Sequence, residues 1–271
     1  PCAITLGTYA WVKPRSDKKL RLYSDNFPHD GIRELDMTDL AYRGSDSWAN
    51  YIKGVFVYLA DLGFAFPHGM DIAFYGNIPN GSGLSSSASF ELLVGVIARK
   101  VYALDIDTLG LVKVGKRVEN DFIGVNSGIM DQFAVGMGKK DHAIFLDCAT
   151  LEYELVPVKL GDYRIVIMNT NKRRELADSK YNERFAETRI ALKELQEHVA
   201  IESLGELTID QFDELKHHLS SELFVKRARH AVSENERTML ATRVLKEGDL
   251  AHFGRLMNES HLSTELDYEV T

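Results

Sequence analysis

The chain has 271 residues, of which 45% are hydrophobic and 27% are charged, as in a folded globular protein rather than a disordered or fibrous one. Acidic residues outnumber basic ones by 40 to 32, and the resulting formal charge of −8 disfavours nucleic-acid binding. Two cysteines exclude a disulfide framework, and no apolar run approaches the roughly 20 residues of a membrane span. We therefore expect a cytoplasmic protein with neither a nucleic acid nor a membrane as its partner.

The first half of the chain is predicted to contain both strands and helices. β-branched and aromatic residues recur over residues 5–12 and 20–23, which predicts two strands joined as a hairpin or meander. Apolar side chains spaced by three and four predict a helix over residues 48–62. A strand over residues 70–75 is followed by a glycine-containing loop and then by an apolar helix over residues 85–103.

The second half of the chain is predicted to be mostly helical. Helical periodicity extends over residues 107–122, 179–198, 209–219, 223–245 and 250–258. Residues 143–146 and 164–168 have the apolar character of buried strands. Strands that come first and helices that come later favour an α+β fold over a doubly wound sheet. We place a domain boundary after residue 158, close to the turn at Gly161 and Asp162.

The loop before the helix at residues 85–103 has the composition of an anion-binding loop. Glycines let backbone N–H groups approach a ligand closely, and the first turn of a helix favours phosphate. Serine hydroxyls add further donors, and one of them can bind Mg²⁺. A plain Gly-Ser turn would explain two glycines and one serine, but three consecutive serines favour the phosphate site. Its residues are Gly81, Ser82, Gly83, Leu84, Ser85, Ser86 and Ser87.

This loop matches neither of the two commonest nucleotide motifs. No lysine follows the glycines, as a Walker A sequence requires, and position 86 is not the third glycine of a dinucleotide fingerprint. The pattern Pro-x-x-x-Gly-Leu-Ser-Ser-Ser-Ala instead resembles the central motif of the galactokinase, homoserine kinase, mevalonate kinase and phosphomevalonate kinase superfamily. Three further stretches resemble bacterial galactokinases: residues 128–133, residues 169–171 with 179–184, and residues 226–230.

The resemblance implies a two-domain small-molecule kinase fold of the α+β class. Residues 1–158 would form an N-terminal domain of the ribosomal-S5-like type with the phosphate loop, and residues 159–271 a mostly helical C-terminal α+β domain. The implied reaction is phosphorylation of galactose at its C1 hydroxyl by ATP, which gives galactose 1-phosphate and ADP and uses Mg²⁺. Galactose and ATP would be the small-molecule partners, while the sequence indicates no oligomeric state.

The resemblance also assigns individual roles. Asp131 matches the catalytic aspartate, which lies on a loop in the family, contacts the C1 hydroxyl and acts as general base. Ser87 and Glu119 match the two Mg²⁺ ligands. Tyr181 matches a tyrosine that contacts galactose, and Ser24 matches a serine that contacts the nucleotide.

Read without the resemblance, several of these residues have simpler interpretations. Glu119 and the basic run at residues 226–230 would lie on solvated helix faces. Trp48 could stack on adenine, but a tryptophan on the apolar side of a helix is more often a core residue, so we leave it outside the predicted site.

Two family motifs do not occur in this sequence. One is the upstream segment Gly-Arg-x-Asn-Leu-Ile-Gly-Glu-His-Thr-Asp-Tyr, which holds the sugar, and the other is a glycine-rich motif of the form Met-Thr-Gly-Ala-Gly-Phe-Gly-Gly. We therefore expect a piece of a longer protein, with both domains incomplete, that is inactive by itself. Two alternatives stay open at this point: a non-catalytic galactose and ATP sensor, and a kinase for another sugar or small alcohol.

Overall fold

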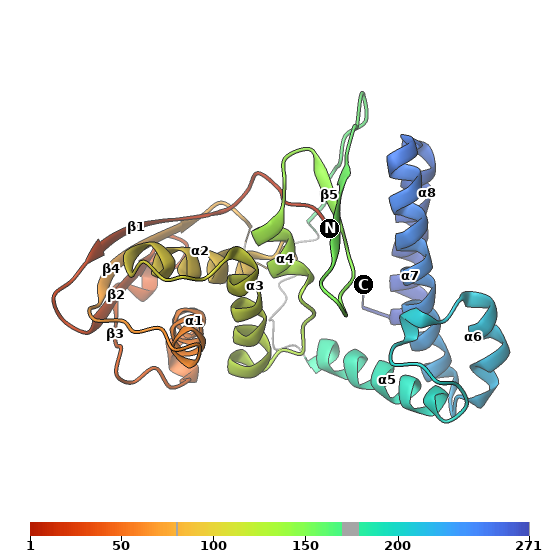
Figure 1. The fold of residues 1–271 in the computed structure, drawn as a ribbon, viewed down its shortest axis with the longest axis horizontal. Helices are drawn as coiled ribbons and strands as arrows, with labels where there is room; N and C mark the ends of the chain where they lie inside the picture. Colours follow the sequence, from red (N-terminus) through yellow and green to blue (C-terminus); the bar gives the residue numbers. More distant parts are fainter. Residues whose placement is uncertain (80, 170–178, 271) are drawn as a thin grey trace. The chain divides into compact units, whose positions relative to one another are not determined.

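The computed structural model describes residues 1–79, 81–169 and 179–270, except for the side chains of residues 179–181. The chain forms two compact units (Figure 1), the first made mainly of Pro1–Lys140 and the second mainly of Ala177–Thr271. Residues 154–166 belong to the second unit, so the domain boundary after residue 158, which stays a prediction, would divide that segment. Within the described ranges, no helix has both the length and the apolar character needed to cross a membrane.

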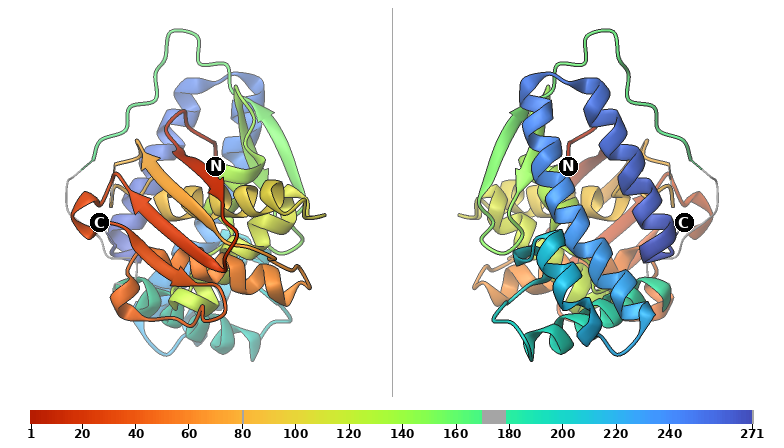
Figure 2. Two further views of the ribbon diagram at one scale, coloured as in Figure 1. Left: turned by 90° about the vertical axis from the view of Figure 1, so that its left-hand side faces the viewer. Right: turned by 90° about the vertical axis from the view of Figure 1, so that its right-hand side faces the viewer.

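The first unit contains a four-stranded sheet. Its strands are β1 (Thr8–Pro14), β2 (Lys19–Ser24), β3 (Arg33–Asp36) and β4 (Met70–Gly76), in the order β1-β4-β2-β3 (Figure 2). Strand β4 runs antiparallel to β1 and parallel to β2. The prediction that β1 and β2 pair as a hairpin is therefore wrong, because β4 lies between them.

A glycine explains how β4 fits between β1 and β2. Gly69 donates its N–H to the carbonyl oxygen of Asp17 at 2.6 Å and accepts from the N–H of Arg15 at 2.9 Å. A Cβ atom on Gly69 would lie only 1.9 Å from the carbonyl oxygen of Lys19. Only glycine allows this close approach of two backbones, and a period-two hydrophobic pattern carries no information about it.

Two helices cover one face of the sheet (Figure 2). They are α1 (Ala49–Asp61) and α2 (Ser86–Val101), and they confirm the two helices predicted around residues 48–62 and 85–103. Alternate residues of β4, namely Met70, Ile72 and Phe74, are buried beneath them. The side chains between these residues point to the other face, so the strand alternates as a half-buried strand should.

The predicted helix over residues 107–122 is confirmed, but its last part is π-helical. Helix α3 (Thr108–Arg117) begins at Asp107, whose carboxylate accepts from the N–H of Gly110 at 2.7 Å. It continues into a π-helical turn, Val118–Ile123, which ends at Gly124 with φ +88°. A loop then leads to α4 (Met130–Met137). Such π-helical turns occur frequently at functional sites.

The second unit is largely helical, as predicted. It contains α5 (Ser179–Gln196), α6 (Ile209–Leu215), α7 (Glu222–Glu247) and α8 (Leu250–Ser263). Helices α7 and α8 lie side by side (Figure 2), joined at Gly248, which has φ +79°, and at Asp249, which caps α8. The predicted turn between these helices is therefore confirmed.

The strand predictions for the second half were partly correct. Strand β5 (His142–Leu146) forms where residues 143–146 predicted it, and it pairs with β6 (Tyr153–Pro157), which was not predicted. Residues 164–168 form no strand, and Ile165, Val166 and Ile167 are each more than half exposed. A strand needs a neighbour for its backbone groups, and no strand in the described ranges pairs with this segment.

The basic run at residues 226–230 is not a solvated face. The side chain of Arg227 is fully buried and forms ion pairs with Glu187 at 2.6 Å and Glu269 at 2.8 Å. Arg184 of α5 forms a second ion pair with Glu187 at 3.0 Å. These contacts join α5, α7 and the chain beyond α8, so this run is structural.

Candidate active site

The predicted phosphate loop is a tight turn in which glycine is required. Gly81 has φ +69° and Gly83 has φ +73°, which are left-handed conformations. Ser85 also has a positive φ of 59° and is the last residue before α2, so the helix begins one residue later than predicted. Among the described residues no side chain caps this helix end. The first N–H groups of α2 therefore remain available to an anion.

Ser87 and Glu119 lie together, as the resemblance implied. The Ser87 hydroxyl donates to Glu119 Oε1 at 2.6 Å, and the Ser127 hydroxyl donates to Glu119 Oε2 at 2.7 Å. Glu119 is 3% exposed, so its interpretation as a residue of a solvated helix face is wrong. A buried carboxylate needs such donors, and the π-helical turn after α3 directs this one toward the phosphate loop.

The two oxygens have a spacing that suits Mg²⁺. Adjacent ligands of an octahedral Mg²⁺ with bonds of about 2.1 Å lie about 3.0 Å apart. The oxygens of Ser87 and Glu119 are 2.6 Å apart in their hydrogen bond, so a shift of a few tenths of an ångström would accommodate the ion. One hydroxyl and one carboxylate are oxygen ligands of the kind that Mg²⁺ prefers.

Asp131 lies near Ser85, the first residue of the same serine run. It occupies the first turn of α4, whereas the resemblance implied a position on a loop. The implied position is therefore wrong, because the helix begins one residue before Asp131. Burial raises the pKa of this half-buried carboxyl group, a hydrogen bond from Ser85 opposes that shift, and the charge of Glu119 adds to it. A carboxylate with a raised pKa is a stronger proton acceptor than an ordinary aspartate.

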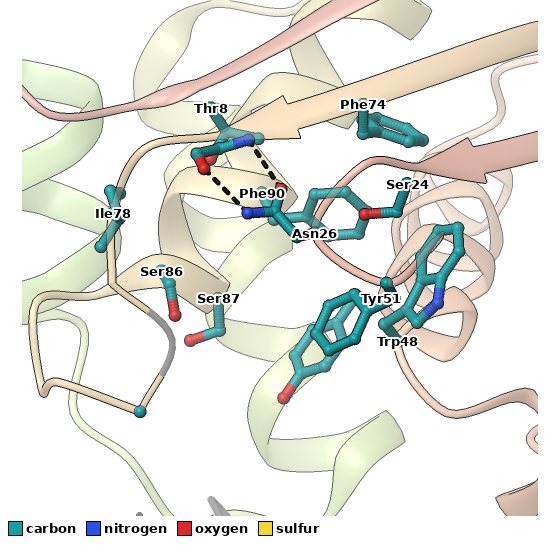
Figure 3. A pocket seen from close by; sticks show the side chains of 13 residues that line it. Thr8, Ser24, Asn26, Trp48, Tyr51, Phe74, Ile78, Ser86, Ser87 and Phe90 are labelled. Carbon is teal, nitrogen blue, oxygen red and sulfur yellow. Dashed lines mark hydrogen bonds between the residues drawn. The ribbon is translucent and has the colours of Figure 1, made fainter. Parts of the chain in front are cut away.

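A pocket of about 220 Å³ opens beside the phosphate loop (Figure 3). Its lining includes Gly81, Ser86 and Ser87 from the loop region and the aromatic side chains of Phe27, Trp48, Tyr51, Phe74 and Phe90. The indole ring of Trp48 stacks on Phe27 with an interplanar angle of 12° and meets Phe90 edge-on. A pocket with an aromatic wall at one end and an anion-binding turn at the other can hold an aromatic base linked to phosphates.

Trp48 is both a core residue and part of the pocket wall, which are the two interpretations considered for it. The residue is 8% exposed, as a core residue should be, but it also forms a wall of this pocket. Its indole N–H donates to Asp30 at 2.9 Å, and Arg33 forms an ion pair with the same carboxylate at 2.8 Å. The hydrogen bond from Arg33, and then that from Trp48, lowers the pKa of Asp30. The ring is therefore fixed by a charged partner outside the pocket.

Two polar residues fix the pocket's edge at the end of the sheet. Ser24, which the resemblance assigned to the nucleotide, is buried at the end of β2 and lines the pocket. The Asn26 amide donates to the carbonyl oxygen of Gly76 at 2.8 Å and accepts from its N–H at 2.7 Å (Figure 3). Sequence reasoning had no signal for Asn26 or Ser127, because both act through contacts distant in sequence.

One predicted site residue cannot be placed. The side chain of Tyr181 lies outside the described residues. Its predicted contact with galactose therefore stays a prediction, whereas Ser24, Ser86, Ser87, Glu119 and Asp131 all lie in the first unit.

Comparison with known proteins identifies relatives of this arrangement. Residues 50–139 match the family model described as the GHMP kinases N terminal domain. The chain is 58% identical over 271 residues to a galactokinase of Enterococcus faecalis and 59% identical to one of Streptococcus mutans, covering all of this chain and 70% of each relative.

Solved structures agree with these matches. The structure of Lactococcus lactis galactokinase complexed with galactose superposes with a TM-score of 0.97 at 51% identity, covering 100% of this chain and 70% of that one. A D-glycero-D-manno-heptose 1-phosphate kinase from Bacteriodes thetaiotaomicron, at 14% identity and a TM-score of 0.57, shares the fold alone. The chain has a mixed α/β kinase fold and shares more than half of its residues with these galactokinases. It therefore belongs to the galactokinase family.

Proposed function

We propose that the protein transfers the γ-phosphoryl group of ATP to the C1 hydroxyl of galactose with the help of Mg²⁺. One observation carries this proposal: three consecutive serines reach three different parts of one site. Ser85 lies close enough to Asp131 to lower the pKa of that carboxyl group, Ser86 lines the aromatic pocket, and Ser87 bonds to Glu119. A single turn of chain thus brings a proton acceptor, a nucleotide pocket and a metal-binding pair together.

The aromatic pocket is suited to the adenine of ATP. Its apolar rings can cover both faces of a planar base, and Ser24 offers a hydroxyl at the rim. The phosphates would then extend toward Gly81 and Gly83 and the first turn of α2. The helix dipole and the N–H groups of that turn stabilise their negative charge.

Ser87 and Glu119 would hold Mg²⁺ beside the phosphates. When bound, the ion neutralises charge that develops on the transferred group. In this arrangement the Ser127 hydroxyl keeps its hydrogen bond to Glu119 Oε2 and so leaves the other carboxylate oxygen for the metal. Burial of Glu119 restricts its rotamers, which fixes the ligand before the ion arrives.

Asp131 would accept the proton of the sugar hydroxyl that attacks the phosphorus. The Ser85 hydroxyl lowers the pKa of the Asp131 carboxyl group against the effect of burial, and the position of Asp131 in the first turn of α4 gives it a defined backbone. General-base assistance of this kind is worth about 10²- to 10⁴-fold in rate. The resemblance adds Tyr181 as a contact to galactose, and the galactose bound to the Lactococcus lactis relative supports this choice of sugar.

The test measures ADP release over a panel of sugars. Two proteins are compared: this chain, and an extended protein that has the full length of the galactokinase relatives, of which this chain covers 70%. The extended protein should release ADP fastest with galactose, and Asp131→Asn should remove that release. A galactose complex without ADP release would instead identify a sensor, and faster release with another sugar would identify a different kinase.

We also infer that the protein works in the cytoplasm. Cys2 and Cys148 are both exposed and free, as expected in a reducing compartment. Fractionation of cells that produce the extended protein tests this inference, and recovery of the activity outside the cytoplasmic fraction would contradict it.

A further inference from the structure

A second acid is buried beside the proposed site and has no role in the mechanism above. Glu91 lies in α2, one helical turn after Ser87, and is 1% exposed. Burial raises its pKa well above the usual range for glutamate, and the charge of Glu119 raises it further. An ionised Glu91 would therefore be a second buried negative charge close to the first, which is energetically unfavourable.

The hydrogen bonds around Glu91 indicate where its proton goes. Gln132 Nε2 donates to Glu91 Oε2 at 3.1 Å. The other oxygens of the same two side chains, Glu91 Oε1 and Gln132 Oε1, are buried, and neither has a hydrogen-bond partner among the described residues. These two buried oxygens are both acceptors, so a hydrogen bond between them needs one additional hydrogen atom. A proton on Glu91 Oε1 would supply it, because the neutral acid would donate to Gln132 Oε1 while it accepts from Gln132 Nε2.

The pair is enclosed by three helices. Glu91 belongs to α2 and Gln132 to α4, and Gly115 of α3 packs directly on both. A Cβ atom on Gly115 would lie 3.0 Å from Gln132 Cγ and 3.0 Å from Glu91 Oε2. The protein must therefore satisfy the polar atoms of this pair from its own side chains.

The pair connects the two elements that carry the proposed chemistry. Gln132 directly follows Asp131 in α4, and Glu91 follows Ser87 by one turn in α2. We propose that Glu91 is a positioning residue that, as a neutral acid bonded twice to Gln132, holds α4 against α2 and so keeps Asp131 at the phosphate loop. This proposal rests on the role proposed above for Asp131. A displacement of about 1 Å at a reacting group can cost about 100-fold in rate, so such a link affects turnover.

The test uses two substitutions of Glu91 in the extended protein. Glu91→Gln mimics the neutral acid, because its amide both donates to and accepts from Gln132, so kcat should stay within about twofold of wild type. Glu91→Leu fills the space but leaves both polar atoms of Gln132 without partners. It should lower kcat about tenfold or more while KM for ATP changes little, because the nucleotide pocket is untouched. A purely structural role would not lower kcat in Glu91→Leu while KM for ATP stays the same and Glu91→Gln keeps the kcat of wild type.

A second measurement needs neither activity nor a stable leucine variant. The infrared difference spectrum of the wild-type chain minus Glu91→Gln at neutral pH should contain the carbonyl stretch of a protonated carboxyl group. A carboxylate band in its place would overturn the proposal, as would an unchanged kcat in Glu91→Leu or an equal loss in both variants. If instead Asp131→Asn keeps full activity, the proposed function has failed, whereas the infrared result still reports on Glu91 alone.

Discussion

The hydroxyl of Ser87 and the carboxylate of Glu119 are joined by a 2.6 Å hydrogen bond across 32 residues of sequence. This contact links the first turn of α2 to the π-helical turn after α3 and brings the Ser87 and Glu119 oxygens together beside the aromatic pocket. If Mg²⁺ bound here as proposed, the Ser87 proton would point away from Glu119, because a ligand oxygen offers its lone pair to the ion.

The first prediction concerns the metal dependence of the rate. Ser87→Ala and Glu119→Gln in the extended protein should each raise the Mg²⁺ concentration that gives the half-maximal rate, because each removes or weakens one ligand. The measurement is a Mg²⁺ titration at saturating ATP and galactose. Ser233→Ala is the matched control, since that hydroxyl bonds to the carbonyl oxygen of His230 in α7. A titration curve identical to wild type would remove the affected residue from the metal site.

Ser87 and Glu119 show what the sequence can and cannot reveal. The glycines and serines of the phosphate loop follow local rules of backbone conformation and helix ends, so they were predictable from a ten-residue pattern. The burial of Glu119 depends on α3, the π-helical turn and Ser127, which lie together only in the folded chain. Composition and periodicity assigned Glu119 to a solvated face, and only the family resemblance named it as a ligand.

The fold shows the same division between local and distant contacts. Helices with an apolar period, such as α1, formed where they were predicted because their pattern is local. The predicted pairing of β1 with β2 was wrong because β4 lies between them. That insertion depends on the close approach of the Gly69 and Lys19 backbones, which the sequence pattern does not reveal. Arg227 was misread for a related reason: its carboxylate partners come from α5 and from the chain after α8.

The second prediction tests Asp131 as the proton acceptor. Asp131→Asn in the extended protein should lower kcat for galactose by about 100-fold or more, because the amide keeps the shape but accepts no proton. The affinity for ATP should be unchanged, since Asp131 does not line the nucleotide pocket. Asp121→Asn, at a side chain that is 59% exposed, is the control. Near-normal turnover in Asp131→Asn would exclude its role as base.

The third prediction follows from the Ser85 hydroxyl. This hydrogen bond lowers the pKa of Asp131 against the effect of burial, so Ser85→Ala should raise that pKa further. The carboxylate form is the active one, and activity is lost as the pH falls through the pKa. The acidic limb of kcat/KM for galactose should therefore move to higher pH in Ser85→Ala. The profile is measured between about pH 4 and pH 8. A limb that stays in place or moves to lower pH would contradict the assigned contact.

The fourth prediction distinguishes the two tryptophans. Trp48→Leu in the extended protein should raise KM for ATP about tenfold or more, because stacking on a base is worth about 1–3 kcal/mol. Trp11→Leu is the matched control, since Trp11 is 69% exposed on β1 and does not line the pocket. Melting temperatures of both variants separate a loss of packing from a loss of stacking. Equal KM values in the two variants would show that Trp48 is a core residue only.

The fifth prediction concerns stability and Glu91. Its folded-state pKa is raised, chiefly by burial and then by Glu119, with a smaller contribution from Asp131, while the bond from Gln132 opposes the shift. The unfolded chain therefore releases this proton at lower pH than the folded chain does, and the wild type loses stability as the pH rises above the unfolded value of about 4.5.

The amide introduced by Glu91→Gln does not titrate, so this variant should become progressively more stable than wild type as the pH rises from about 5 to about 8, at up to about 1.4 kcal/mol per pH unit. Below about pH 4, where Glu91 is neutral in both states, the two proteins should melt at nearly the same temperature. Thermal unfolding of this chain in magnesium-free buffer measures the difference, and Glu197→Gln, a change at an exposed glutamate, is the control. A difference between Glu91→Gln and wild type that stays constant over this range would mean that Glu91 ionises as easily in the folded protein as in the unfolded chain.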